Sequence, residues 1–226
     1  MIGTLVNVGA VIAGSTLGLL IHSRLPQKIT TITFQGIGLF TVFLGITMAM
    51  ETDNPLIMIF SIVLGGILGE TIDIANYLER FGDALKVRVK SKNERFTEGL
   101  LSAFLLFCMG AMTILGAIEE GLGDPPNLLL AKSVLDGFAA IALSTTFGIG
   151  IMFSVVPLLI YQGGLTLFAG LLQNVLSDVV VGEISAVGGL ILLGLGLNIL
   201  EIKEIRLLNM LPALLVAAIL AFFFLQ

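Results

Sequence analysis

Charged residues are scarce in this sequence. They make up 12% of its 226 residues, whereas 57% are hydrophobic, and soluble domains are close to a quarter charged. The mean hydropathy is +1.08, and no soluble core of this size could hide that much apolar surface. The composition therefore excludes an ordinary soluble protein and predicts an all-α polytopic membrane protein.

Cysteine is nearly absent, because Cys108 is the only one. A single thiol excludes a disulfide framework and a thiol-based metal site, and its place in an apolar run predicts a small buried side chain. The sequence also lacks a Walker motif, HExxH, GxSxG and a paired CxxC, so ATP-driven transport and the usual hydrolase chemistries have no support. We expect no enzyme activity and no cofactor.

Long apolar runs dominate what is present. About 20 helical residues cross a hydrocarbon core of ~30 Å, and polar breaks divide the chain into eight runs of that kind. We predict a single transmembrane domain over residues 1–226, with helices near 3–22, 34–51, 55–77, 97–118, 129–152, 155–176, 183–201 and 206–225. A re-entrant loop at 155–176 would reduce the count to seven.

Lysine and arginine gather on one side of this arrangement. Cytoplasmic loops are enriched in these residues, and eight spans with both termini outside place all of them inside, Arg24 included, except Lys132. The segment Tyr77–Arg95 carries six basic residues, with apolar residues at helical spacing from Leu78 to Val89. It predicts an amphipathic helix near 77–95 on the inner surface of the cell membrane.

Two matches indicate an internal duplication of the kind that transporters use. The segment from Asn7 to Gly18 resembles that from Asp136 to Gly148, with the Ser-Thr pairs aligned. The hairpin of the second and third helices also resembles later hairpins. Possible repeat units are residues 1–96 and 129–226, joined by helix 97–118. Their symmetry stays open, because the first match is parallel and a match with the last hairpin is inverted.

Asp136 is the strongest candidate for chemistry. It lies inside a predicted helix beside Ser133, and a charged side chain at the centre of a bilayer costs about 2.5–3.5 kcal/mol. Lys132 stands one turn earlier, so one interpretation is an ion pair that neutralises itself. The other is a site for a cation or proton, to which Asn7 of the matching helix contributes.

Hydroxyl side chains are concentrated at one depth in two predicted helices. They lie about 12 residues, or ~18 Å, from the outer end, close to the midplane. Each hydroxyl can bond the carbonyl four residues earlier and needs no ligand, but their gathering is also typical of a binding site. The set is Ser15, Thr16, Ser144, Thr145 and Thr146.

A proline and two glycines indicate a break in the sixth predicted helix. Pro157 is followed by Tyr161, Gln162, Gly163 and Gly164. Broken membrane helices are tolerated where they line a cavity, and transporters use them at binding sites. We predict a flexible gate here, with Gln162 among the binding residues; a packing kink is the alternative.

Glu70 is a further candidate, toward the inner end of the third predicted helix. Asp73 lies one helical step away. In the alternative interpretation, Arg80 neutralises both carboxylates at the interface.

Two pairs of glycines have the spacing of close helix crossings. They are Gly14 with Gly18, and Gly65 with Gly69. The spacing leaves open whether the crossing lies within the chain or between subunits.

Two stretches resemble the core of a prokaryotic membrane family. They are FCMGAMTILGAIEEG, from Phe107 to Gly121, and AKSVLDGFAA, from Ala131 to Ala140. They resemble the domain-of-unknown-function 554 family, the YqgA-like proteins, and the resemblance extends over essentially the whole chain. It implies an inner-membrane protein that is presumed to be a transporter, with no established substrate or mechanism.

The run Asp136-Gly137-Phe138-Ala139 is also similar to the Asp-Ala-Phe-Ala motif of the manganese exporters of the lysine-exporter superfamily. That resemblance implies a metal site with two acidic ligands. Here Asn7 stands in the place of the second acid, which weakens the case for divalent-metal export, and the metal stays unknown.

These features together favour a secondary transporter of a small solute or ion, coupled to protons or Na⁺ through Asp136. The rivals are an ion channel formed by an oligomer and a membrane scaffold or regulator that acts through the basic amphipathic helix. The expected partners are the lipid bilayer, a small solute or cation, and further copies of the chain in a homo-oligomer. We expect no nucleic-acid partner.

Overall fold

The computed structural model describes residues 1–22, 26–173 and 175–225, and every regular element in that part of the chain is helical. The predicted all-α class is therefore confirmed. Arg24 lies outside the described residues. The elements are α1 (Ile2–His22), α2 (Gln27–Ala49), α3 (Pro55–Ile72), α4 (Ile74–Arg88), α5 (Phe96–Cys108), α6 (Ala111–Leu122), α7 (Asn127–Phe147), α8 (Gly150–Phe153), α9 (Val155–Leu167), α10 (Ala169–Leu172), α11 (Asp178–Ile199), the 3₁₀ turn η1 (Leu207–Met210) and α12 (Pro212–Phe224).

Seven helical segments of the described chain are long and apolar enough to cross a membrane, and a bent pair makes an eighth. The bent pair is α5 with α6, which meet at 65°, so the single helix predicted over 97–118 is wrong. The backbone turns at Met109 and Gly110, and the Thr113 hydroxyl donates to the Phe107 carbonyl at 2.9 Å. That bond satisfies a carbonyl that the break leaves free.

The sixth predicted helix, 155–176, is interrupted later than we expected, at Phe168 between α9 and α10. Helix α9 runs without a break through Tyr161–Gly164, and a turn at Ser154, just before the predicted start of this helix, separates α8 from α9. Pro157 accounts for this position, since a proline has no amide hydrogen to donate and its ring clashes with the carbonyl four residues before it. The Ser154 hydroxyl donates to the Ile151 carbonyl at 2.7 Å. Residues 150–167 remain a candidate span.

Helix α7 ends before the predicted boundary at residue 152. Gly148 has a φ of 74°, a conformation that favours glycine, and it stops the helix at Phe147. The Asn93 side chain donates to the Phe147 carbonyl at 3.0 Å. A Cβ atom at Gly148 would stand 2.1 Å from the Asn93 amide nitrogen, so this close approach also requires glycine.

The chain divides into two compact units. Unit 1 comprises residues 1–37, 79–108 and 112–170, and unit 2 comprises residues 38–78, 109–111 and 171–226. Each unit is therefore assembled from separate stretches of sequence. The proposed repeat units, 1–96 and 129–226, stay a prediction.

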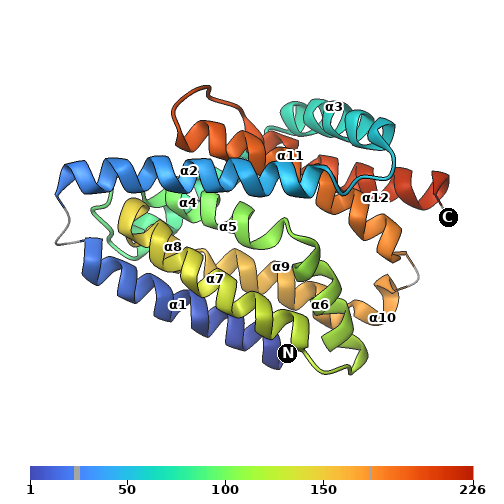
Figure 1. Ribbon diagram of the computed structural model, residues 1–226, viewed down its shortest axis with the longest axis horizontal. Coiled ribbons are helices and arrows are strands. Elements are labelled where there is room, and N and C mark those ends of the chain that lie inside the picture. Colours follow the sequence, from blue (N-terminus) through green and yellow to red (C-terminus); the bar gives the residue numbers. More distant parts are fainter. Residues whose placement is uncertain (23–25, 174, 226) are drawn as a thin grey trace. The chain divides into compact units, whose positions relative to one another are not determined.

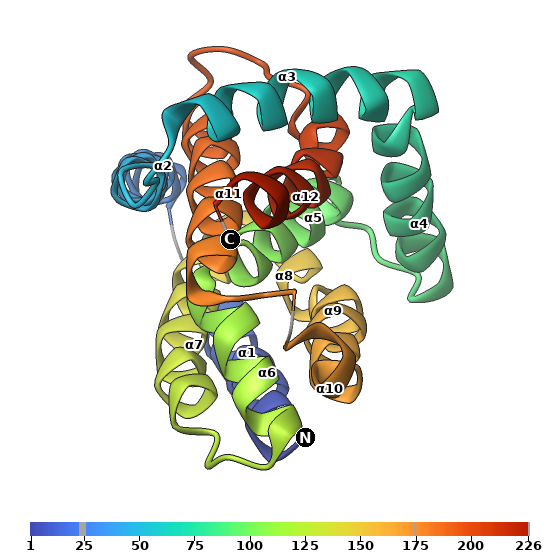
Figure 2. The same cartoon turned by 90° about the vertical axis from the view of Figure 1, so that its right-hand side faces the viewer.

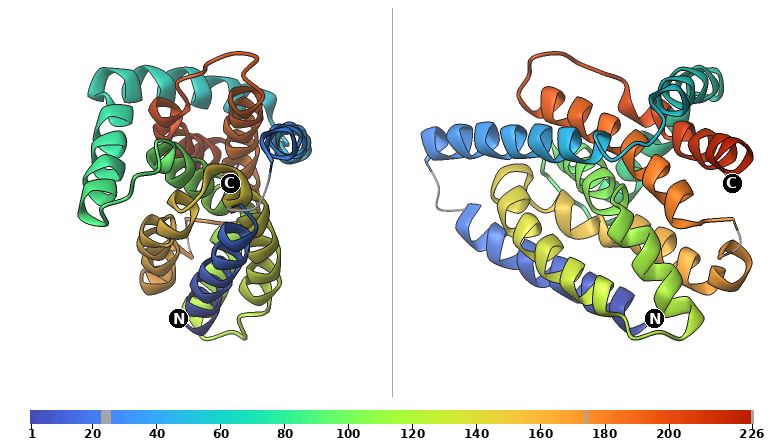
Figure 3. Two further views of the ribbon diagram at one scale, coloured as in Figure 1. Left: turned by 90° about the vertical axis from the view of Figure 1, so that its left-hand side faces the viewer. Right: turned by 45° about the vertical axis from the view of Figure 1, so that its right-hand side comes forward.

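Helices α1 and α7 pack side by side in unit 1 (Figure 1; Figure 3), with Gly14 against Gly137 and Gly18 against Ile141. A Cβ atom at Gly14 would stand 2.2 Å from the Gly137 carbonyl oxygen, and one at Gly18 would stand 2.4 Å from that of Ile141. The predicted crossing is confirmed, and it lies within the chain. Residue numbers rise together along the contact, so the two helices are parallel.

The parallel packing bears on the number of spans. Two parallel spans must be separated along the chain by an odd number of crossings. Helices α2 and α3 supply two, and α4 is too polar to supply another. The bent pair α5 and α6 therefore has to cross once, which favours eight spans over seven.

Unit 2 contains an equally close contact, between α3 and the last helical segment of the described chain, η1 with the start of α12. A Cβ atom at Gly65 would stand 2.2 Å from the Ala213 Cα atom, and one at Gly69 would stand 1.9 Å from the Asn209 carbonyl oxygen. The predicted Gly65–Gly69 crossing is thus confirmed as an internal, antiparallel contact. Helix α11 is the most buried of the candidate spans.

The predicted amphipathic segment 77–95 is helical over much of its length, as α4. Asp73 ends α3 with a φ of 60°, and the chain turns there into α4 (Figure 2). Lys86 and Arg88 lie in the last turn of α4, where cations favour the helix dipole. Tyr77 and Val87 are among its exposed apolar side chains.

Candidate functional site

A buried ion pair lies near the middle of α7 in unit 1. The Lys132 ammonium donates to Asp136 Oδ2 one turn along the helix, and the two residues are 5% and 7% exposed. Asp136 stands nine residues from the start of α7, a rise of ~14 Å. The Lys132 nitrogen also lies 6.0 Å from the centre of the Phe107 ring, within reach of a cation–π interaction. The predicted contact between the two charges is present, and it is buried.

Asn7 of α1 joins this pair to α9. Its side-chain amide donates to Asp136 Oδ2 at 2.9 Å and to Gln162 Oε1 at 3.1 Å. Asn7 and Gln162 are both completely buried. Three helices that are distant in the sequence therefore bring their polar side chains to one point, as we predicted for Asn7, Asp136 and Gln162.

The polar contacts continue from Gln162 toward the start of α1. The Gln162 amide donates to the Thr4 hydroxyl at 3.2 Å, and that hydroxyl donates to Glu120 Oε2 at 3.4 Å. The backbone N–H of Gly3 donates to Glu120 Oε1 at 2.7 Å. A connected chain of polar groups, which we call the polar chain, thus runs through Lys132, Asp136, Asn7, Gln162, Thr4 and Glu120.

One acceptor in the polar chain is left over. Asn7 Oδ1 is buried and has no hydrogen-bond partner among the described residues. An unpaired buried polar atom costs roughly 1–3 kcal/mol, so each one requires an explanation. Here the atom lies on a side chain that already donates to Asp136 and Gln162.

The predicted hydroxyl cluster is only partly brought together. Thr16 is exposed and donates to the Ile12 carbonyl at 2.8 Å, so it faces away from the polar chain. Ser133 donates to the Leu129 carbonyl at 2.6 Å, and Thr145 to the Ala142 carbonyl at 2.6 Å. Thr16 and Ser133 bond the carbonyl four residues earlier, as in the alternative that we gave, and so does Thr146 at 3.4 Å, whereas the bond of Thr145 reaches back three residues.

Two other serines keep a functional interpretation. The hydroxyls of Ser15 and Ser144 are buried and lack a partner within the described part of the chain. Ser144 and its neighbours Thr145 and Thr146 lie in the last turn of α7, about 25 Å along the helix from its start. Helix α7 begins and ends earlier than the hydropathy indicated, so these residues lie nearer its end than we expected, and their depth in the bilayer stays a prediction.

The residues predicted as a gate lie in regular helix. Pro157, Tyr161, Gly163 and Gly164 all belong to α9, so a break at Tyr161–Gly164 does not exist. Tyr161 packs edge-on against Phe104 with ring centres 6.5 Å apart. A Cβ atom at Gly164 would meet nothing within 4 Å. This segment is interrupted at Ser154, before α9, and at Phe168, after it.

Glu70 belongs to unit 2, whereas the residues of the polar chain belong to unit 1. The Arg206 guanidinium donates to Glu70 Oε1, and the Asn209 amide donates to Glu70 Oε2 at 2.6 Å. Arg206 also lies 3.9 Å from Asp73. The expected neutralisation of the two acids therefore occurs, but Arg206 supplies the charge in place of Arg80.

Sequence reasoning missed Thr4, Glu120 and Glu183 as organising residues. Glu183 of α11 is 1% exposed, and its carboxylate accepts from the Thr52 hydroxyl and from the N–H groups of Asp53 and Asn54 at 2.7–2.9 Å. A single acid inside the run Val181–Val187 was the available signal. Among the described residues, no three His, Cys, Asp or Glu side chains are grouped closely enough to hold a metal ion.

A helical chain with seven or eight segments of membrane length is a multi-pass membrane protein embedded in the lipid bilayer. Within this membrane protein, the polar chain belongs to unit 1. The chain belongs to the family described as protein of unknown function DUF554, which matches residues 2–222. The resemblance noted in the sequence is thereby confirmed.

Two relatives match the chain over nearly its full length. The uncharacterized membrane protein YdfK of Bacillus subtilis is 35% identical over 98% of this chain and 96% of its own length. The uncharacterized protein YqgA of Escherichia coli is 34% identical over 96% of this chain and 94% of its own length. No solved structure matches the chain.

Proposed function

We propose that the protein is a secondary transporter of a small solute or ion, coupled to Na⁺ or protons, with its binding site at the polar chain of unit 1. The observation that carries the proposal is the burial of Lys132, Asp136, Asn7 and Gln162 in helices of membrane length. Charged groups at that depth are costly and mark ion or substrate pathways in membrane proteins.

The charges of the site indicate how a cation would bind. Lys132 already neutralises Asp136, so an incoming cation has to compete with a tethered ammonium for the same carboxylate. Asn7 Oδ1 and Gln162 Oε1 are oxygen ligands of the kind that alkali cations take, and both lie on side chains connected to Asp136. A site of this kind releases its cation when Lys132 returns to the carboxylate.

The proposed path of the cation continues from the polar chain along α1 and α7. Ser15 lies further along α1 than Asn7, and Ser144 lies further along the parallel α7 than Asp136. Their buried hydroxyls have no partner among the described residues, so they provide polar positions beyond the polar chain toward the other ends of the two helices. Ser154, where the segment α8–α9 is interrupted, replaces Tyr161–Gly164 as the position for a gate.

Flux measurements test the proposal. The protein is reconstituted in vesicles that contain a pH-sensitive dye, and gradients of Na⁺, K⁺ and Mn²⁺ are imposed in turn. We expect a saturable flux for one of these cations, at least tenfold lower for Asp136→Asn because the variant loses the charge that binds the cation. The matched control is Glu204→Gln, which removes an exposed acid and leaves the flux unchanged.

Two other results would overturn the transporter. A non-saturating, voltage-driven current would identify a channel, and a channel further requires an oligomer, which the mass of the purified protein would reveal. A lack of flux, together with binding to anionic vesicles that is lost when Lys86, Arg88 and Lys90 are neutralised, would identify a scaffold that acts through the basic end of α4 and its loop.

The orientation is proposed on charge alone. Both termini are placed outside, because the basic loops are then cytoplasmic. Single cysteines at Asp124 and Lys203 test this with a reagent that does not cross the membrane. The native Cys108 is buried, so it leaves the background low. Labelling at 124 and not at 203 in intact cells supports the orientation, and the reverse pattern inverts it.

A further inference from the structure

A groove of about 630 Å³ opens on unit 2 between α3 and the segment that follows α11. Its volume falls within the usual range for small-molecule sites. Most of its wall is apolar and comes from Ile62, Val63, Gly66 and Ile67 of α3, with Met210 of η1. Val63 and Ile67 are more than half exposed, so the groove is open along the side that these two residues line.

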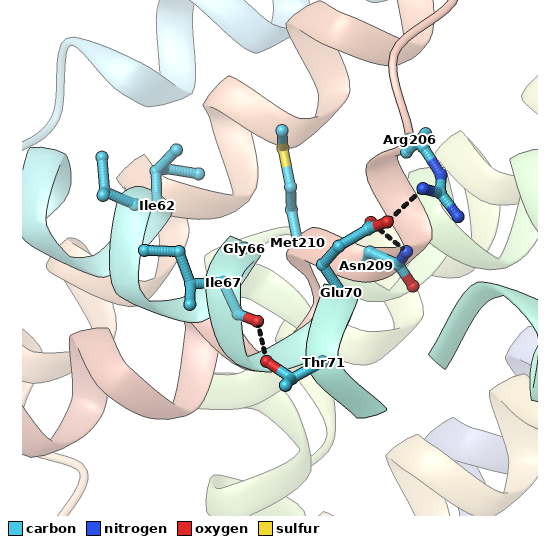
Figure 4. Close-up of a pocket in the computed structure, with 9 residues that line it drawn as sticks. Ile62, Gly66, Ile67, Glu70, Thr71, Arg206, Asn209 and Met210 are labelled. Carbon is cyan, nitrogen blue, oxygen red and sulfur yellow. Dashed lines mark hydrogen bonds and ion pairs between the residues drawn. The ribbon is translucent and has the colours of Figure 1, made fainter. Parts of the chain in front are cut away.

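One end of the groove is charged. Figure 4 shows the carboxylate of Glu70 turned toward Arg206 and Asn209, while Ile62 and Ile67 lie at the other end. Asn209 is buried, and its side-chain oxygen accepts from the Ala75 N–H at 2.7 Å, which fixes this end of the groove to the start of α4. The Arg206 and Glu70 side chains are 62% and 50% exposed, so both remain accessible.

The position of the charged end matches the interface of a bilayer. Glu70 lies two residues before the end of α3, a helix of 18 residues that spans ~27 Å. The apolar wall from Ile62 to Ile67 lies deeper along the same helix. The groove is therefore polar at the level of lipid headgroups and apolar at the level of acyl chains, which is the profile of a phospholipid.

The charges select the headgroup. Two carboxylates, Glu70 and Asp73, face one guanidinium, so the cluster has an excess of one negative charge and disfavours an anionic lipid. The guanidinium carries five N–H donors and suits a phosphate, whereas the carboxylates suit a primary ammonium that donates hydrogen bonds. We propose that the groove binds a phosphatidylethanolamine, with its phosphate at Arg206, its ammonium at Glu70 and Asp73, and an acyl chain along Gly66.

Gly66 provides the sharpest variant. A Cβ atom there would meet only Met210 Cγ, at 3.9 Å, so a leucine enters the groove without strain and fills the acyl position. The matched control is Gly36→Leu in α2, where a Cβ atom meets nothing within 4 Å. Both changes replace a helical glycine with a better helix former, so both proteins should fold.

Native mass spectrometry of the purified full-length protein measures the binding. The protein is incubated with equimolar dioleoyl phosphatidylethanolamine, phosphatidylcholine and phosphatidylglycerol. We expect the first bound lipid to be phosphatidylethanolamine by about fivefold over each of the others, the size expected for a partly exposed charge pair. Gly66→Leu should remove this preference, and Gly36→Leu should keep it.

A second variant tests the headgroup alone. Asp73 has a left-handed backbone that asparagine also tolerates, so Asp73→Asn removes one charge and keeps the turn. It should lower the preference for phosphatidylethanolamine over phosphatidylcholine. Equal binding of the three lipids in the unmodified protein, or an unchanged preference in Gly66→Leu, would overturn the proposal. So would a dimer that Gly66→Leu dissociates, since a second copy would then cover the groove.

Discussion

The two units of this protein place their charged groups differently. Unit 1 carries Lys132 and Asp136 midway along α7, buried together with two amides. Unit 2 keeps Glu70 and Arg206 at the end of α3, half exposed, and uses the buried Glu183 to hold the loop before α3. In unit 2, Glu70 lies near the end of α3 and pairs with Arg206, and Glu183 accepts from the loop before α3. In unit 1 the same residue types lie deep in a span, which is why the site is assigned there.

The contrast between Glu183 and Asn7 makes the same point at the level of atoms. The Glu183 carboxylate accepts three hydrogen bonds from residues 52–54, so capping the loop accounts for its burial. Asn7 is equally buried but keeps an oxygen without a partner among the described residues. The burial of Glu183 is thus explained by its contacts, whereas one buried oxygen of Asn7 has no such explanation.

The largest expected effect tests the burial of the ion pair. Asp136→Asn leaves the Lys132 ammonium without its counter-charge, and breaking a buried pair in this way costs about 3–5 kcal/mol. The double variant Lys132→Met/Asp136→Leu removes both charges and should restore the free energy of unfolding to the starting value or above it. Unfolding in detergent micelles measures both. Equal stability of the single and double variants would contradict a buried pair.

The next effect compares a tightly packed glycine, Gly69 of unit 2, with a glycine that has open space around it, Gly9 of unit 1. Gly69→Ala drives a Cβ atom against the Asn209 carbonyl oxygen, 1.9 Å away, and should lower the free energy of unfolding by about 1–3 kcal/mol. Gly9→Ala meets nothing within 4 Å and should raise it by about 0.5–1 kcal/mol, since alanine is the better helix former. Thermal unfolding in detergent ranks the two, and a stabilised Gly69→Ala would show that α3 and η1 are further apart.

A smaller and local effect is expected for Glu183. Glu183→Gln keeps the shape of the side chain but turns charge-assisted bonds to Asp53 and Asn54 into neutral ones, which are roughly half as strong. The loss should be about 1–2 kcal/mol and confined to the loop before α3. Hydrogen exchange should become faster at residues 53 and 54 while α1 and α7 keep their protection. Faster exchange throughout unit 1 would contradict this assignment.

The smallest effect on stability concerns the two serines without partners. Ser15→Ala and Ser144→Ala remove a buried hydroxyl that makes no hydrogen bond to the described residues, so the free energy of unfolding should stay constant or rise by up to ~1 kcal/mol. Ser133→Ala, which loses a bond to the Leu129 carbonyl, should lower it by about 0.5–1.5 kcal/mol. A cation flux that falls in the first two variants at constant stability would place both hydroxyls on the path.

Much of the fold was predictable because hydropathy acts locally. An apolar run of about 20 residues has to cross the bilayer wherever it occurs, so the spans followed from counting. The glycine crossings followed from spacing within one helix. The breaks were less predictable. The fourth span bends at Met109 and Gly110, a place with no proline, and the sixth predicted helix is interrupted at Phe168 and not at Tyr161–Gly164.

Four residues of the polar chain were predictable, namely Lys132, Asp136, Asn7 and Gln162, but most of its contacts between helices were not. Asp136 and Lys132 are four residues apart on one helix, so their pairing could be read directly. Asn7 was found through its match with Asp136 in a repeated segment. Glu70 was given the wrong cation, because Arg206 is 136 residues away whereas Arg80 is nearby in sequence.

The sequence by itself determined that this is a multi-pass helical membrane protein and that Asp136 with Lys132 is its most unusual feature. Both depend on composition and on neighbours within one helix. Only the tertiary structure decided that Asn7 and Gln162, which are 155 residues apart, share a hydrogen bond and that Asn7 Oδ1 is left without one. Such contacts arise from the packing of α1 against α7 and α9, and no local pattern records which helices meet.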